Sequence, residues 1–163
     1  MPIFYLIIYD DKKLKMAKRY TDTDIWIKQR WFKKLEPSHK LVWKYLTDRC
    51  NHAGIWKIDY AQLIDDTGID GFDLSSFIDS CNTDFDPKNG KKISRERIKL
   101  IEKFNILWIT GFIQFQYEGK EFSVNPRVPA IKSALEILHG YKTLTEGLQK
   151  GYITLTEPFK TVS

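Results

Sequence analysis

Three segments in the first half of the chain carry apolar residues at the spacing of an α-helix, and turn signals separate them. The first begins at Pro37, which suits the first turn of a helix, and its apolar stripe contains Leu41, Val42, Tyr45, Leu46 and Cys50. The second spans residues 60–67, with Asp59 as its expected N-cap and Gly68 as the residue expected to end it. The third carries the stripe Leu74, Phe77, Ile78 and Cys81. The chain is therefore expected to build its core from short amphipathic helices.

Strands are expected between and after these helices. Residues 55–58 alternate in character and predict a short strand. Residues 95–100 alternate charged and apolar side chains, residues 102–105 can turn the chain, and residues 106–117 are rich in β-formers. Together they predict a hairpin whose second strand is long. Gly111 inside that strand suggests a bulge or the close approach of another backbone.

The rest of the chain is expected to form a loop, a last helix and two extensions. Residues 82–90, rich in Asn, Asp, Pro and Gly, predict a loop. The last helix is expected to begin at Asn125 and Pro126 and to stop at Gly140, with Ile131, Ala134, Leu135 and Leu138 on one face. We divide the chain into an N-terminal extension (residues 1–15), a central domain (residues 16–120) and a C-terminal helical extension (residues 121–163). The first extension is either a β-strand or a mis-called segment upstream of an initiator at Met16.

Composition favours a folded protein of a reducing compartment. Hydrophobic residues make up 42% and aromatic residues 14% of the chain, which excludes a disordered tail. The two cysteines, Cys50 and Cys81, form no disulfide framework. The apolar run at residues 2–9 is too short to span a bilayer and lacks the form of a signal peptide. We therefore expect a cytoplasmic protein with no membrane partner.

Charge is distributed in three blocks. Residues 1–57 contain 13 Lys/Arg and 6 Asp/Glu, residues 58–87 contain 8 acidic residues and no Lys or Arg, and residues 88–163 contain 13 Lys/Arg and 7 Asp/Glu. Two basic blocks around an acidic one predict a polarised surface, which favours an anionic partner on one side.

The order of elements is typical of an α+β winged helix-turn-helix, in which three helices and a short strand precede a β-hairpin wing, here with a C-terminal helix added. It resembles the winged-helix N-terminal domain of phage and prophage replication initiators and replisome organisers, which is similar to DnaD-like primosomal proteins. The matching segments are residues 21–26 (TDTDIW), 31–35 (WFKKL), 40–46 (KLVWKYL), 52–56 (HAGIW), 108–116 (WITGFIQFQ) and 125–126 (NP). The resemblance implies binding of double-stranded DNA at a replication origin, self-assembly into a homo-oligomer, and recruitment of replication proteins such as a helicase or its loader.

Three groups of cations are candidate DNA contacts. The wing group contains Lys91, Lys92, Arg95, Arg97, Lys99 and Lys103, of which Arg95, Arg97 and Lys99 are expected to share one strand face. The group before the first long helix contains Lys18, Arg19, Lys28, Arg30, Lys33 and Lys34. The group on the last helix contains Arg127 and Lys132. Contacts of these cations with phosphates would make the affinity fall steeply with salt.

The helix expected to read the major groove, residues 72–81, lies in the acidic block. It carries Asp73 and Asp79 and no cation, so phosphates on both sides of the groove would repel it. We therefore expect the wing and the basic arm to dominate DNA binding.

Catalytic and metal-binding motifs are incomplete. The tripeptide at residues 66–68 (DTG) occurs in aspartic proteases, but no second copy exists and it ends an expected helix. A calcium loop from residue 84 fails because Lys88 and Arg95 occupy ligand positions. Cys50, His52, Cys81 and His139 lack the spacing of paired zinc ligands. We expect a protein that is not an enzyme and has no cofactor and no metal site.

The aromatic residues at positions 25–35 (IWIKQRWFKKL) have two interpretations. Single-strand binders stack bases on exposed aromatic rings between cations, whereas aromatic residues beside an amphipathic helix usually belong to the core. We assign Trp26, Trp31 and Phe32 to the core.

Two other functions remain open. A transcriptional regulator of the same fold would bind a palindromic operator as a discrete dimer. A protein–protein interaction module would dock a basic partner through the acidic residues 58–87.

Overall fold

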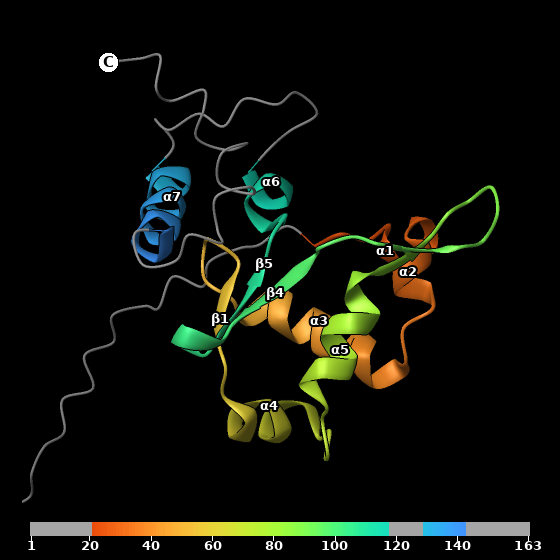
Figure 1. The fold of residues 1–163 in the computed structure, drawn as a ribbon. Helices are drawn as coiled ribbons and strands as arrows, with labels where there is room; N and C mark the ends of the chain where they lie inside the picture. Colours follow the sequence, from red (N-terminus) through yellow and green to blue (C-terminus); the bar gives the residue numbers. More distant parts are fainter. Residues whose placement is uncertain (1–20, 118–128, 143–163) are drawn as a thin grey trace, which may run out of the picture.

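The computed structural model describes residues 21–117 and 129–142, which form an α+β fold with small antiparallel sheets, as the sequence predicts (Figure 1). The elements in chain order are α1 (Ile25–Lys28), α2 (Arg30–Lys33), α3 (Pro37–Arg49), β1 (Ile55–Lys57), α4 (Tyr60–Thr67), α5 (Leu74–Asn82), β2 (Thr83–Phe85), β3 (Lys92–Ser94), β4 (Ile98–Ile101), the 3₁₀ turn η1 (Glu102–Phe104), β5 (Ile106–Ile109), α6 (Phe112–Tyr117) and α7 (Pro129–Lys142).

Local capping signals place α4 and α5. The carboxylate of Asp59 accepts a hydrogen bond from the backbone amide of Gln62, and Gly68 ends α4 with φ at 69°, as the sequence predicts. Asp73 caps α5 by accepting from the amides of Ser75 and Ser76. A side chain that satisfies free amide groups at a helix start stabilises that helix by about 1 kcal/mol.

A three-stranded antiparallel sheet with the order β1-β5-β4 forms the centre of the molecule. The pairing of β4 with β5 confirms the predicted hairpin, and it places Ile98 opposite Ile109 and Ile101 opposite Ile106. The turn passes through η1 and Asn105, whose φ is 51°. On its other edge β5 pairs with β1, so a strand from the first half of the chain completes the sheet.

Helices lie on both sides of this sheet (Figure 1), and a hydrophobic cluster covers each of its faces. On one face, Leu46 of α3, Leu63 of α4 and Phe77 of α5 pack against Ile98 and Leu107. On the other face, Ala134 and Leu138 of α7 and Ile113 of α6 pack against Ile55 and Trp108, among others. The sheet is therefore enclosed between α3, α4 and α5 on one face and α6 and α7 on the other.

A second hairpin lies between α5 and β4 in the chain and projects from the molecule (Figure 1). Its strands, β2 and β3, pair with Thr83 opposite Ser94 and Phe85 opposite Lys92. The loop prediction for residues 82–90 is therefore wrong at residues 83–85, where Phe85 is half-buried and is held by the partner strand. We call residues 83–94 the projecting hairpin.

The long second strand predicted over residues 106–117 is wrong beyond Ile109. All four residues of β5 are buried, and the chain then forms α6, where Phe112, Ile113 and Gln116 are buried and Phe115 is exposed. Aromatic and aliphatic residues in this segment fit a helical spacing as well as strand alternation.

The predicted close backbone approach occurs at Gly54 and not at Gly111. A Cβ atom on Gly54 would lie 2.4 Å from Cβ of Phe112 and 2.8 Å from the carbonyl oxygen of Ile109, and the φ of Gly54 is 79°. A Cβ on Gly111 would meet nothing within 4 Å. Only glycine fits at position 54, because the first residue of α6 packs against the turn before β1.

The last helix continues through Gly140 to Lys142, so the predicted stop is wrong. The ring of Tyr141 packs edge-on against Phe104 with 5.3 Å between centroids, and this contact favours another helical turn. Burial of Ile131, Ala134 and Leu138 confirms the predicted face, whereas the predicted start at Asn125 and Pro126 lies outside the described residues. No helix in the described residues is long and apolar enough to cross a bilayer.

Candidate nucleic-acid interface

Two basic segments that are distant in sequence meet where α2 packs on β2. The ammonium of Lys34, directly after α2, lies 3.3 Å from the centroid of the Phe85 ring on β2. A cation over an aromatic face is attracted by the ring's electrons. This contact holds the arm before α3 against the base of the projecting hairpin.

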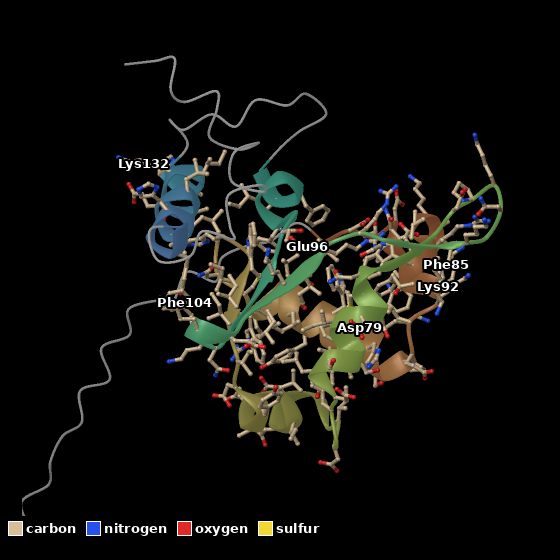
Figure 2. All side chains as sticks on the ribbon, viewed as in Figure 1. Asp79, Phe85, Lys92, Glu96, Phe104 and Lys132 are labelled. Carbon is tan, nitrogen blue, oxygen red and sulfur yellow. The ribbon has the colours of Figure 1, made fainter. Side chains whose placement is uncertain are left out.

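Seven exposed cations define the basic surface. They come from the α2 segment (residues 30–34) and from the projecting hairpin with the residue that follows it, and they are Arg30, Lys33, Lys34, Lys88, Lys91, Lys92 and Arg95. Residues 28–36 and 83–97 together carry nine Lys/Arg against four Asp/Glu, a net charge of +5 that equals the charge of the whole chain. The positive excess is therefore concentrated here, on the side where Figure 2 labels Phe85 and Lys92. Sequence reasoning missed Lys88 as a candidate, because its turn, DPKNG, fits a loop and an incomplete calcium site.

Arg97, which the sequence predicts as a phosphate contact, makes three contacts within the fold. Its guanidinium donates to Asp84 Oδ2 at 2.6 Å and to the carbonyl oxygen of Cys81 at 3.1 Å, and it stacks 4.5 Å from the ring centroid of Trp31. The side chains of Arg97 and Asp84 are both only 16% exposed. These contacts fix the guanidinium inside the fold, where little of it remains exposed to a phosphate.

Asp84 holds two arginines at the base of the projecting hairpin. Arg95 Nε lies 3.4 Å from the same carboxylate oxygen, but its side chain remains 66% exposed. Burial raises the pKa of Asp84, but hydrogen bonds from the Phe85 amide and Arg97 and the charges of Arg97 and Arg95 outweigh burial, so its pKa lies below the usual value. The carboxylate therefore stays charged and keeps both guanidinium groups in place.

The prediction that Arg95, Arg97 and Lys99 share one strand face is wrong. β4 begins only at Ile98, so regular alternation does not extend to the two arginines. They converge on Asp84, whereas Lys99 lies 3.5 Å from Glu96.

Two other predicted cations, on η1 and α7, lie away from the basic surface. Lys103 lies in η1, its ammonium 5.7 Å from the Phe104 ring centroid, and Lys132 on α7 lies 3.9 Å from Glu136. Figure 2 labels Phe104 and Lys132 on the opposite side of the molecule from Lys92. Lys28 pairs with Asp24, and the predicted contacts Lys18, Arg19 and Arg127 lie outside the described residues.

The acidic block is partly used for structure. Asp59 and Asp73 cap helices and Asp84 binds arginines. Asp66 accepts hydrogen bonds from the Tyr45 hydroxyl at 3.0 Å and from Gln62 at 2.9 Å. The exposed acidic residues of α4, α5 and the segment between them include Asp65, Asp70 and Asp79.

The aromatic stretch divides between core and surface. Burial of Trp31 and Phe32 confirms their assignment to the core. The assignment of Trp26 to the core is wrong, because 53% of this residue is exposed. The helix breaks at Gln29, whose ψ is 100°, so α1 and α2 are not one continuous helix. Trp26 on α1 therefore does not share the buried face that carries Trp31 and Phe32 on α2.

The described residues contain no group of three or more His, Cys, Asp or Glu that could hold a metal ion. The side chains of Cys50 and Cys81 are buried thiols. Burial also raises the pKa of the Cys81 thiol, partly offset by the charge of Arg97.

No protein-family model, curated protein or solved structure matched the chain.

Proposed function

We propose that the described residues, 21–117 and 129–142, form a winged helix-turn-helix domain that binds double-stranded DNA and catalyses no reaction. The observation that carries the proposal is the convergence of the α2 segment and the projecting hairpin into one basic surface. Apart from the projecting hairpin inserted between α5 and β4, the order α3, β1, α4, α5, β4, β5 and the sheet order β1-β5-β4 are those of a winged helix and support this fold.

The basic surface supports a phosphate-based mode of binding. Its cations come from two segments held together by packing, so they are presented to a ligand as one unit. Lys and Arg that neutralise phosphates release counterions, which supplies most of the affinity and makes it depend on salt. Phosphate contacts of this kind orient a protein on the duplex without selecting a sequence.

The helix α5 contributes little to this mode. Its exposed residues include Ser75, Ser76 and Asp79, and residues 72–82 contain no cation. Hydrogen bonds from serine to base edges remain available, but the attraction to DNA comes from the projecting hairpin and α2. The hairpin that makes this contact precedes β4, whereas the predicted wing lay between β4 and β5.

A role in replication initiation in a phage or prophage is proposed from the resemblance of the sequence. In that role the domain would assemble on origin DNA as a homo-oligomer and recruit a helicase or its loader. A winged-helix transcriptional regulator would instead form a discrete dimer on a palindromic site. Analytical ultracentrifugation of the DNA complex separates the two, because origin assembly gives complexes larger than a dimer.

The test of DNA binding is a salt titration of fluorescence anisotropy on a labelled duplex. The variant K33E/K91E/K92E reverses three cations of the basic surface. The matched control K57E/K103E/K132E makes the same charge change at exposed positions on β1, η1 and α7. Thermal melts of both variants establish that they remain folded.

Wild type is expected to bind with a steep salt slope. Loss of three phosphate contacts reduces the log–log slope by roughly 2.7 units, and the control variant keeps nearly the wild-type slope. Equal weakening by both variants would show that only net charge matters. If wild type shows no salt-sensitive binding, the DNA proposal is wrong, and docking of a basic protein on the exposed Asp65, Asp70 and Asp79 becomes the better explanation.

A further inference from the structure

Trp26 differs from the other four tryptophans of the chain. Trp31, Trp43, Trp56 and Trp108 are all buried, whereas 53% of Trp26 is exposed. Its neighbour Ile27 is also exposed, at 70%. A large aromatic side chain in water gives up the stabilisation that burial would provide, and a ligand that covered it would recover that stabilisation.

The Trp26 ring is held in place on α2. It makes an edge contact with the ring of Phe32, with 4.8 Å between centroids and 88° between planes. Phe32 is fully buried and contacts Trp31 in the same manner. Trp26 is therefore a positioned ring and not a freely rotating side chain, and binding through it would cost little conformational entropy.

Three cations of the basic surface belong to the segment that holds this ring. Arg30 and Lys33 lie on α2, on either side of the two aromatic residues that anchor the Trp26 contact, and both are exposed. Lys34 follows and reaches Phe85 of the projecting hairpin. An apolar protein partner that covered Trp26 would have to desolvate these charges. A polyanion with flat apolar groups would satisfy both the ring and the cations.

We propose that Trp26 stacks on an unpaired base and that the basic surface therefore binds single-stranded DNA in addition to duplex. The proposal rests on the proposed function, because the same cations hold the phosphates in both modes. In a duplex the base faces are covered by their neighbours, so Trp26 has a stacking partner only where a strand is open. The inference adds recognition of opened DNA to the duplex binding proposed above.

The test compares wild type, W26A and W26F on a dT oligomer of about 15 nucleotides and on a duplex of matched length. W26F keeps a flat ring, and Y60A, which removes an exposed aromatic residue on α4, is the control. Because Trp26 is the one exposed tryptophan among the five, all of which lie in the described residues, iodide quenching of tryptophan emission reports on this ring. Binding of dT should protect the emission from iodide in wild type, and this protection should be absent in W26F.

W26A is expected to lose about tenfold in affinity for dT, which is typical of removing one stacked base, and less than twofold for duplex. W26F and Y60A should stay within about threefold of wild type on both ligands. If W26A weakens dT and duplex equally, or if dT leaves iodide quenching unchanged, the stacking proposal is overturned. Failure of wild type to bind duplex would overturn the proposed function instead, and the dT measurements would still decide the role of Trp26.

Discussion

Arg97 provides the sharpest test of the described structure, because the sequence and the fold assign it different roles. As a phosphate contact, it could be replaced with little effect on stability. As the anchor of the projecting hairpin, it joins Asp84, the Cys81 carbonyl and the Trp31 ring. We predict that R97M destabilises the protein strongly, whereas R95M, which removes the second and more exposed partner of Asp84, has a small effect.

The magnitude follows from the interactions that the substitution removes. A charge-assisted hydrogen bond between half-buried groups contributes about 1.5–3 kcal/mol, and the stacking of a guanidinium on tryptophan adds about 1 kcal/mol. Methionine recovers part of the packing on Trp31, so R97M should lower the free energy of unfolding by about 3 kcal/mol. In a chain of this size such a decrease lowers Tm by roughly 10 °C. R95M should cost under about 1 kcal/mol, as exposed ion pairs usually do.

The pH dependence of this effect is determined by Asp84. Because its pKa lies below the usual value in the folded state, the ion pair is fully present above the unfolded-state pKa of about 3.9 and is lost as pH falls through the lower folded-state pKa. The difference in Tm between wild type and R97M should therefore be largest near neutral pH and shrink as the pH falls below the unfolded-state pKa and through the lower folded-state pKa.

Thermal melts followed by circular dichroism at neutral and at acidic pH measure the Tm difference between wild type and R97M. A double-mutant cycle with D84N isolates the contribution of the Arg97–Asp84 ion pair. An R97M variant that melts like wild type but has reduced DNA affinity would refute the structural role. A Tm difference that does not change with pH would show that the stabilisation comes from packing and not from the ion pair.

Three further predictions concern the core. G54A should lower the free energy of unfolding, measured in urea, by more than about 3 kcal/mol, because the new Cβ overlaps Phe112. The control G68A has a similar φ but open space around it, so it should lower the free energy of unfolding by only about 1 kcal/mol. H39L should raise the urea midpoint by an amount equivalent to about 1 kcal/mol, because Nδ1 of His39 is buried without a hydrogen-bond partner among the described residues; a lower midpoint would contradict this. The thiol of Cys81 should resist thiol-specific reagents until the protein unfolds, because burial raises its pKa and blocks access; rapid labelling of the native protein would contradict this.

Several elements follow from signals within a few residues of each other. Asp59 and Gly68 bound α4 because N-capping and a left-handed stop are local backbone requirements. The stripe of α5 and the pairing of β4 with β5 were likewise predicted from periodicity and turn residues. Periodicity was insufficient at residues 106–117, where packing of α6 against the turn at Gly54 decided between helix and strand.

The basic character of the chain and the α+β class were determined by the sequence alone, because charge and periodicity are properties of residue order. Which cations act together was decided only by tertiary structure. Packing of α2 on β2 brings the two basic segments together. The ion pair with Asp84 holds Arg97 within the fold. The break in the helix at Gln29 leaves Trp26 exposed. Each of these outcomes depends on contacts or chain directions that nearest neighbours in sequence do not specify, and the same amino acid is a ligand contact or a structural anchor according to its partners in space.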